Sequence, residues 1–172
     1  MATNNSINNN GLSLIQTQTV SSVTALAFTQ GITTNYNNYL FISSNFNNPP
    51  GTGVQLLLQI SIDGGATYIN TNYSPNAISA STASFVASTL VLPSSTMFAN
   101  SKCYLLNMTS AVGYPTTIVS TSNFDSINGY ILVTNNLSNA YSITPTVANA
   151  LQIIMDDGSA FSGSFSLYGY SQ

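Results

Sequence analysis

The stretch that most constrains the fold runs from residue 54 to residue 69. Residues 54–62 are mainly aliphatic, and their alternation makes one face of an extended strand fully apolar and the other face mixed. The run ends at Asp63-Gly64-Gly65, residues that tolerate the positive φ angles of tight turns, and the β-forming segment 67–69 follows at once. This order predicts a β-hairpin whose apolar face must be covered by a second layer.

Short extended segments separated by turn residues recur along the rest of the chain, and no segment shows a sustained helical period with caps. The predicted strands are 12–28 (one long or two short strands), 39–42, 54–62, 85–92, 103–108, 116–120, 130–133, 140–143, 151–155 and 161–170. About eight to ten strands with turns at this spacing predict an all-β fold, specifically a jelly-roll-like antiparallel β-sandwich.

Charged residues are nearly absent from the sequence. They make up 3% of it, and comprise Lys102 and the aspartates Asp63, Asp125, Asp156 and Asp157, whereas a typical soluble domain has roughly 25%. Hydrophobic residues make up 44% and the net charge is −3, so copies of the chain repel one another weakly. We therefore expect a homo-oligomer, and a trimer in particular.

The same composition argues against several classes of partner. Binding to nucleic acid requires several basic residues that neutralise phosphates, and a single Lys cannot do this. Attraction to an anionic membrane surface fails for the same reason. No apolar run approaches the roughly 20 residues that span a bilayer. We expect neither nucleic acid binding nor membrane insertion.

The N-terminal leader is polar and rich in Asn, and it lacks the basic and apolar regions of a signal peptide. A polar leader with little to bury becomes ordered mainly when another surface holds it. We therefore divide the chain into an N-terminal arm for assembly or anchoring, residues 1–11, and a single β-sandwich domain, residues 12–172.

Two Asp-Gly sequences are the candidate polar sites: Asp63-Gly64-Gly65 and Asp156-Asp157-Gly158. Carboxylates in loops can bind calcium, but no loop here alternates acidic residues at a ligand spacing. Aspartate before glycine more often forms a turn in which its side chain bonds the local backbone. We expect these six residues to form turns, with no metal and no cofactor.

Catalytic arrangements are hard to build from this composition. Cys103 has no His to activate it and is expected to be a small core residue. A Ser-His-Asp triad cannot be formed without His, and paired-carboxylate chemistry would need two of the four aspartates to converge. The sequence predicts no catalytic residues and no enzymatic activity.

Tyrosines are candidate surface-contact residues. They could stack on the sugar rings of a host-surface glycan, or pack at strand ends and subunit contacts. The second role is favoured over the first. The tyrosines singled out are Tyr36, Tyr39, Tyr73, Tyr114 and Tyr141.

Two segments resemble a known group of proteins. The pattern Ser-x-Asp-Gly-Gly-x-Thr-Tyr at 61–68, and the closing Ser-Gly-x-x-x-Leu-Tyr-Gly at 162–169, are similar to segments of small bacteriophage virion structural proteins of the tail-fibre, head-fibre and decoration kind. The segment 39–46 lies where such proteins carry a strand. The chain departs from the group in its near-absence of charge.

The resemblance implies a non-enzymatic subunit of a virion, attached to capsid or tail, that assembles with itself and with other virion proteins. One alternative is a receptor-binding fibre tip that recognises a host-surface glycan. Another is a subunit of a non-viral extracellular filament or surface lattice. The implied location is the virion, or alternatively the extracellular space.

Overall fold

The computed structural model describes residues 11–47, 55–70, 73–75, 85–89, 97–110, 116–125, 131–141 and 147–170. The proposed arm lies outside this part of the chain except for Gly11, so the division into an arm and a domain stays a prediction.

These residues form eleven β-strands and no helix, so the expectation of an all-β fold is confirmed. The strands are β1 (Leu12–Val23), β2 (Ala25–Phe28), β3 (Asn38–Asn47), β4 (Gln55–Ser61), β5 (Tyr73–Pro75), β6 (Phe85–Thr89), β7 (Met97–Leu106), β8 (Thr116–Asp125), β9 (Ile131–Tyr141), β10 (Ala150–Met155) and β11 (Phe161–Tyr170). Within the described ranges there is accordingly no helix that could span a membrane.

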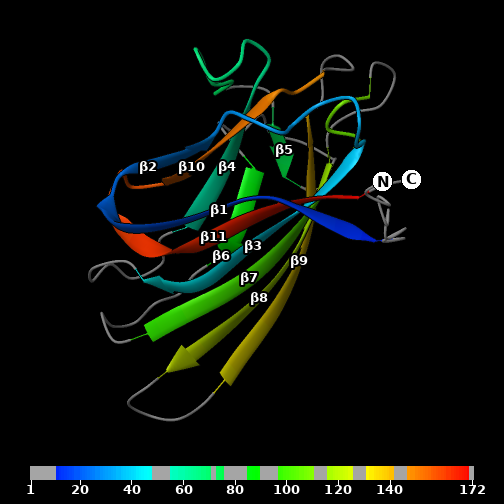
Figure 1. Ribbon diagram of the computed structural model, residues 1–172. Helices are drawn as coiled ribbons and strands as arrows, with labels where there is room; N and C mark the ends of the chain where they lie inside the picture. Colours follow the sequence, from blue (N-terminus) through cyan, green and yellow to red (C-terminus); the bar gives the residue numbers. More distant parts are fainter. Residues whose placement is uncertain are drawn as a thin grey trace, which may run out of the picture.

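The strands make two sheets in which every neighbouring pair is antiparallel. The large sheet has the order β1-β11-β3-β7-β8-β9-β5, and the small sheet has the order β2-β10-β4-β6. Figure 1 shows β1, β11, β3, β7, β8 and β9 following one another across the large sheet, with β2, β10 and β4 in a second layer. This arrangement shows two packed antiparallel sheets but does not by itself establish jelly-roll connectivity.

Side-chain alternation explains why the two sheets pack together. In β11, the side chains of Phe161, Phe165 and Leu167 are fully buried, while the intervening serines and tyrosines are only partly buried. In β10, Leu151, Ile153 and Met155 are buried in the same alternating way. Each sheet therefore offers one apolar face, and the two faces share a single hydrophobic core.

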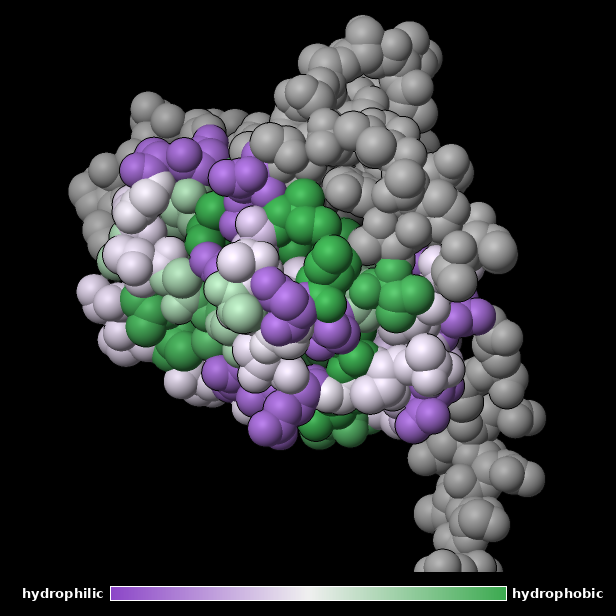
Figure 2. Space-filling view, turned by 90° about the horizontal axis from the view of Figure 1, so that it is seen from above, coloured by the Kyte–Doolittle hydropathy of each residue, from purple (hydrophilic) through white to green (hydrophobic). Residues whose placement is uncertain are grey.

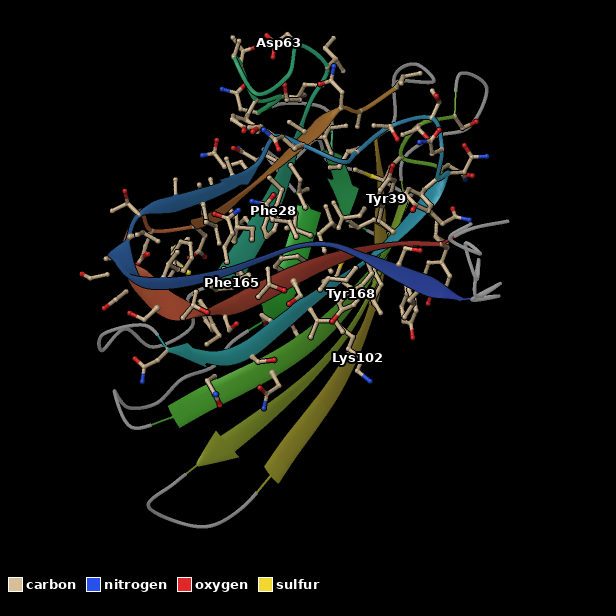
Figure 3. The ribbon with its side chains drawn as sticks, viewed as in Figure 1. Phe28, Tyr39, Asp63, Lys102, Phe165 and Tyr168 are labelled. Carbon is tan, nitrogen blue, oxygen red and sulfur yellow. The ribbon has the colours of Figure 1, made fainter. Side chains whose placement is uncertain are left out.

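Aromatic rings join the sheets within this core. Phe28 of β2 meets Phe41 of β3 edge to face, with ring centroids 6.2 Å apart. Phe41 in turn stacks on Phe165 of β11 at 6.0 Å, and Phe165 contacts Phe161 at 5.5 Å. Figure 3 shows Phe28 and Phe165 directed toward the space between the layers.

One corner of the sandwich is made by the passage from β1 to β2. The chain bends at Thr24 and leaves the large sheet for the small one. Ser22 has a φ of 55°, and the register between β1 and β11 shifts between Val20 and Val23. The side chain of Gln18 donates a hydrogen bond to the backbone oxygen of Ala27 at 2.8 Å, which holds the two strands together across this corner.

The prediction of a hairpin at residues 54–69 is wrong in one respect. The turn is present, but residues 67–69 form no strand, and a single backbone bond from Ile69 N to Ile60 O (2.9 Å) links them to β4. Both edges of β4 are already paired, one with β10 and the other with β6. The returning segment therefore has no free edge to join.

Strand boundaries also differ from the prediction. The segment 12–28, expected as one long or two short strands, forms two, β1 and β2. The expected strands at 130–133 and 140–143 are instead replaced by one strand, β9, which runs through Asn135 and Asn136. Ladder pairing with β8 on one side supports those asparagines despite their low strand propensity. Residues 54, 90–92, 130 and 142–143 of the predicted strands lie outside the described ranges.

Candidate interaction surface

The outer face of the large sheet is a surface whose side chains the structure describes on β1, β11, β3 and residues 100–106 of β7. Because alternate residues of a strand point to opposite faces, the burial of Phe165 and Leu167 directs Ser164, Ser166 and Tyr168 outward. The register then places residues from distant parts of the sequence beside them: Thr17 lies opposite Ser166, and Leu40 lies opposite Tyr168.

One half of the described part of this face is lined by hydroxyl groups. Thr17 and Ser166 share a hydrogen bond at 2.8 Å between their side-chain oxygens, and Thr19 and Ser164 share one at 3.2 Å. Ser162 accepts a hydrogen bond from the backbone N–H of Ser22 at 2.9 Å. These hydroxyls are already paired across the strands, so this half is polar, uncharged and held in place.

The other half is apolar and aromatic, and we call it the sheet patch. Along one row, Leu14 of β1, Tyr168 of β11, Leu40 of β3 and Tyr104 of β7 lie opposite one another in register. Leu14 is 58% exposed and Leu12, on the same strand, is 37% exposed. The sheet patch comprises Leu12, Leu14, Leu40, Tyr104, Tyr168 and Tyr170. Leu12 and Leu14 are its exposed members, the three tyrosines are half-buried, and Leu40 is only 4% exposed.

Two of the tyrosines stack on each other within the sheet patch. The ring centroids of Tyr104 and Tyr170 are 6.4 Å apart with an interplanar angle of 29°. Burial raises the pKa of Tyr170 above its ordinary value, and the neighbouring Tyr104 phenol adds to the effect. Tyr170 therefore stays neutral at physiological pH, with a hydroxyl that can both donate and accept a hydrogen bond.

Lys102 lies at the border of the sheet patch. It precedes Tyr104 by two residues on β7, is exposed, and lies opposite Ile42 of β3 in register. Lys102 is the only Lys or Arg in the sequence, so the outer face of the large sheet carries the one basic side chain of the protein.

The Asp63 turn forms a tightly bonded loop. The Asp63 carboxylate accepts hydrogen bonds from the Ser61 hydroxyl (2.6 Å), the Thr67 backbone N–H (2.9 Å) and the Thr67 hydroxyl (2.6 Å). These bonds, those from the Ser61 and Thr67 side chains first, lower the pKa of Asp63 from 3.8 to about 2. Gly64 and Gly65 have φ values of 75° and 91°. The Asp63 carboxylate therefore stabilises the turn in which it lies.

Asn149 connects this loop to the start of β10. Its side chain accepts a hydrogen bond from Gly64 N (2.8 Å) and donates one to Ile62 O (2.9 Å), while its backbone N–H donates to Ser61 O (2.8 Å). The loop is thus fixed at one end of the sandwich, and Figure 3 shows Asp63 there, well away from Lys102.

The second Asp-Gly sequence also turns the chain. Asp157 accepts a hydrogen bond from the Ser159 backbone N–H at 2.9 Å, and the interaction with Ser159 lowers the pKa of Asp157. Gly158 has a φ of 73°, and its N–H bonds Met155 O at 3.1 Å. Asp156 is exposed beside them. Among the described residues, no three His, Cys, Asp or Glu side chains gather in a way that could hold a metal ion.

Cys103 lies in the core on β7 and is fully buried. Burial raises the pKa of its thiol far above the ordinary value, which keeps it protonated. A buried, protonated thiol is not a nucleophile.

The tyrosines singled out from the sequence do not form one surface. The prediction that Tyr39 is an exposed contact residue is wrong, because its side chain is fully buried. Its hydroxyl donates a hydrogen bond to Thr33 O (2.8 Å) and accepts one from Thr33 N (2.9 Å). This pairing satisfies its hydroxyl, so the ring can enter the core. Tyr36 is half-buried, packs edge to face on Tyr39, and leaves no space for a Cβ at Gly169.

Tyr73 and Tyr141 lie directly opposite each other in the β5–β9 ladder, and Tyr114 lies outside the described residues. The residues of the sheet patch were not among the predicted contacts. The alternation in 161–170 could have placed Tyr168 and Tyr170 on the outer face, but the strand order that adds Leu14 and Tyr104 is not readable from the sequence.

Comparisons with known proteins give only distant structural likenesses. No protein-family model matches the chain, and no curated protein sequence matches it. Two solved structures of scytalido-glutamic peptidase with transition-state analogues match 72% and 81% of the chain, with 10% and 11% sequence identity and TM-scores of 0.31 and 0.33. SCP-B, a member of the eqolisin family of peptidases in complex with a tripeptide, matches 72% with 8% identity and a TM-score of 0.27.

The chain spans 59%, 66% and 58% of the lengths of these three structures. The comparison contradicts two expectations from the sequence, a virion structural protein and a chain without enzymatic activity, because these three solved structures are peptidases. We withdraw both expectations. At this identity and TM-score, the likeness does not carry the activity of those peptidases over to this chain.

Proposed function

We propose that this protein is a subunit that associates with copies of itself through the sheet patch. The observation that carries the proposal is the row on the outer face of the large sheet in which Leu14 is 58% exposed, Tyr168 and Tyr104 are half-buried, and Leu40 between the tyrosines is 4% exposed. Tyrosine is among the residues that are enriched in protein interfaces, and charged residues are depleted at their centre.

The charge of the protein supports the same proposal. With a single basic residue and four acidic ones, two copies can approach without the repulsion that keeps many soluble proteins apart. The hydroxyl half of the face is uncharged as well, so contact buries few groups that would lose strong hydration.

We do not propose a glutamic peptidase activity, because the acidic residues of the sequence are all aspartates. The jelly-roll arrangement is retained as a proposal, supported by two antiparallel sheets on one core. The resemblance of the two motifs to phage proteins, the location, and recognition of a glycan stay sequence-based predictions, since no comparison bears on them.

Sedimentation velocity over a range of protein concentrations tests the proposal. The wild-type chain is expected to sediment as an oligomer, and Leu14→Asp is expected to shift it toward the monomer. Thr19→Asp, an exposed position on the hydroxyl half of the same face, is the matched control and should associate like the wild type. A wild-type chain that stays monomeric throughout would contradict the proposal.

A further inference from the structure

A second exposed apolar surface lies at the end of the molecule that holds the Asp63 loop. Ile62 is 54% exposed and Val147 is 40% exposed. Val147 lies two residues before Asn149, whose hydrogen bonds to Ser61, Ile62 and Gly64 bring the two segments to one place. We call Ile62 and Val147 the tip patch. Figure 2, which views the molecule from this end, shows hydrophobic residues at the surface among hydrophilic ones.

The tip patch and the sheet patch differ in charge. Asp63 follows Ile62 directly, is exposed, and is ionised at neutral pH because its turn stabilises the carboxylate. Lys102 borders the sheet patch and is also exposed. Figure 3 shows the two charges in separate parts of one molecule, so an attraction between them at short range requires two molecules.

From these two surfaces we infer that the tip patch of one copy docks on the sheet patch of the next, with Asp63 facing the neighbour's Lys102. The inference rests on the proposed self-association and specifies its geometry. Contact between two different patches is heterologous, and such contacts close into rings when the rotation between copies allows it. The expected trimer is a ring of this kind, in which every copy uses both patches.

The apolar parts of the two patches supply most of the attraction. An exposed pair of opposite charges is worth little by itself, so the Asp63–Lys102 attraction mainly selects the orientation of the contact. We expect Lys102→Glu to weaken association several-fold at low salt, and we expect much of this difference to disappear at high salt because ions screen exposed charges.

A mixing experiment distinguishes this contact from a symmetric one between two sheet patches. Leu14→Asp alters only the sheet patch, and Ile62→Asp alters only the tip patch. In an equimolar mixture, the intact tip of the first variant can dock on the intact sheet patch of the second. The other contact would join two altered patches of like charge and should not form.

The inference therefore predicts that each variant alone is monomeric and that the mixture forms a one-to-one dimer, with all species measured by sedimentation velocity. Unchanged thermal melting of each variant confirms that it is folded. If the wild type associates but Ile62→Asp associates equally well, or if the mixture stays monomeric, the inference is overturned while self-association stands. A monomeric wild type would overturn both.

Discussion

Phe28 and Phe41 meet edge to face with their ring centroids 6.2 Å apart, although they belong to different sheets. Phe28 lies on an edge strand of only four residues, so this contact links the edge of the small sheet to an interior strand of the large one. Both side chains are fully buried.

Phe28→Ala should therefore destabilise the protein strongly. Loss of a buried Phe side chain removes its transfer free energy and leaves a cavity, at a cost of roughly 3–5 kcal/mol. Denaturant unfolding measures the change, and Ala25→Ser, at an exposed position of the same strand, serves as the control. A loss of less than about 1 kcal/mol for Phe28→Ala would contradict this account of the core.

The two glycines of the Asp63 turn should respond differently to substitution by Ala. Both have positive φ, which costs an L-residue roughly 1–2 kcal/mol. A Cβ at Gly64 would meet nothing within 4 Å, whereas a Cβ at Gly65 would lie 2.7 Å from Thr29 Cγ2 and 2.9 Å from the Tyr68 hydroxyl oxygen. Gly65→Ala should thus lower the denaturation midpoint more than Gly64→Ala. Equal decreases in the denaturation midpoint would show that the side chains of Thr29 and Tyr68 can move away from a Cβ at Gly65 without a measurable loss of stability.

Stability should fall in acid partly because of Asp63. Its pKa is about 2 in the folded protein and 3.8 without the interactions of its turn. A lowered folded pKa gives stabilisation that is complete above the unfolded value and is lost as the pH falls from 3.8 toward 2. Melting temperatures measured between pH 6 and pH 2 should fall less steeply for Asp63→Asn than for the wild type.

The pKa of Asp157 is lowered too, by its interaction with Ser159, so Asp63→Asn should reduce the acid sensitivity without removing it. Asp157→Asn provides the comparison, because its loop is separate from that of Asp63. Identical pH profiles for Asp63→Asn and the wild type would contradict the role given to the Asp63 carboxylate.

Strands whose pattern is local could be predicted from the sequence. The alternation in β11 gives both its position and its buried face, because a period of two depends only on neighbouring residues. The Asp63 turn was predictable for the same reason. The absence of the second hairpin strand could not be predicted in this way. It follows from the pairing of both edges of β4 with β10 and β6, which lie far from β4 in the sequence.

The candidate surface was hard to predict because it depends on the order of the strands. Leu14, Leu40, Tyr104 and Tyr168 share a row only because β11 and β3 lie between β1 and β7. Tyr39 was predicted to be exposed because no local sequence pattern indicates that its hydroxyl forms hydrogen bonds with the backbone of Thr33. Local patterns predicted strands, and long-range pairing decided which side chains meet.

Light scattering on the purified chain at low and high salt shows whether the protein self-associates through uncharged contacts. We expect an oligomer, a trimer of the 18.1 kDa chain, whose mass changes little with salt because apolar and tyrosine contacts hold it. A monomer of 18.1 kDa at both salt concentrations would contradict the claim and leave only the fold.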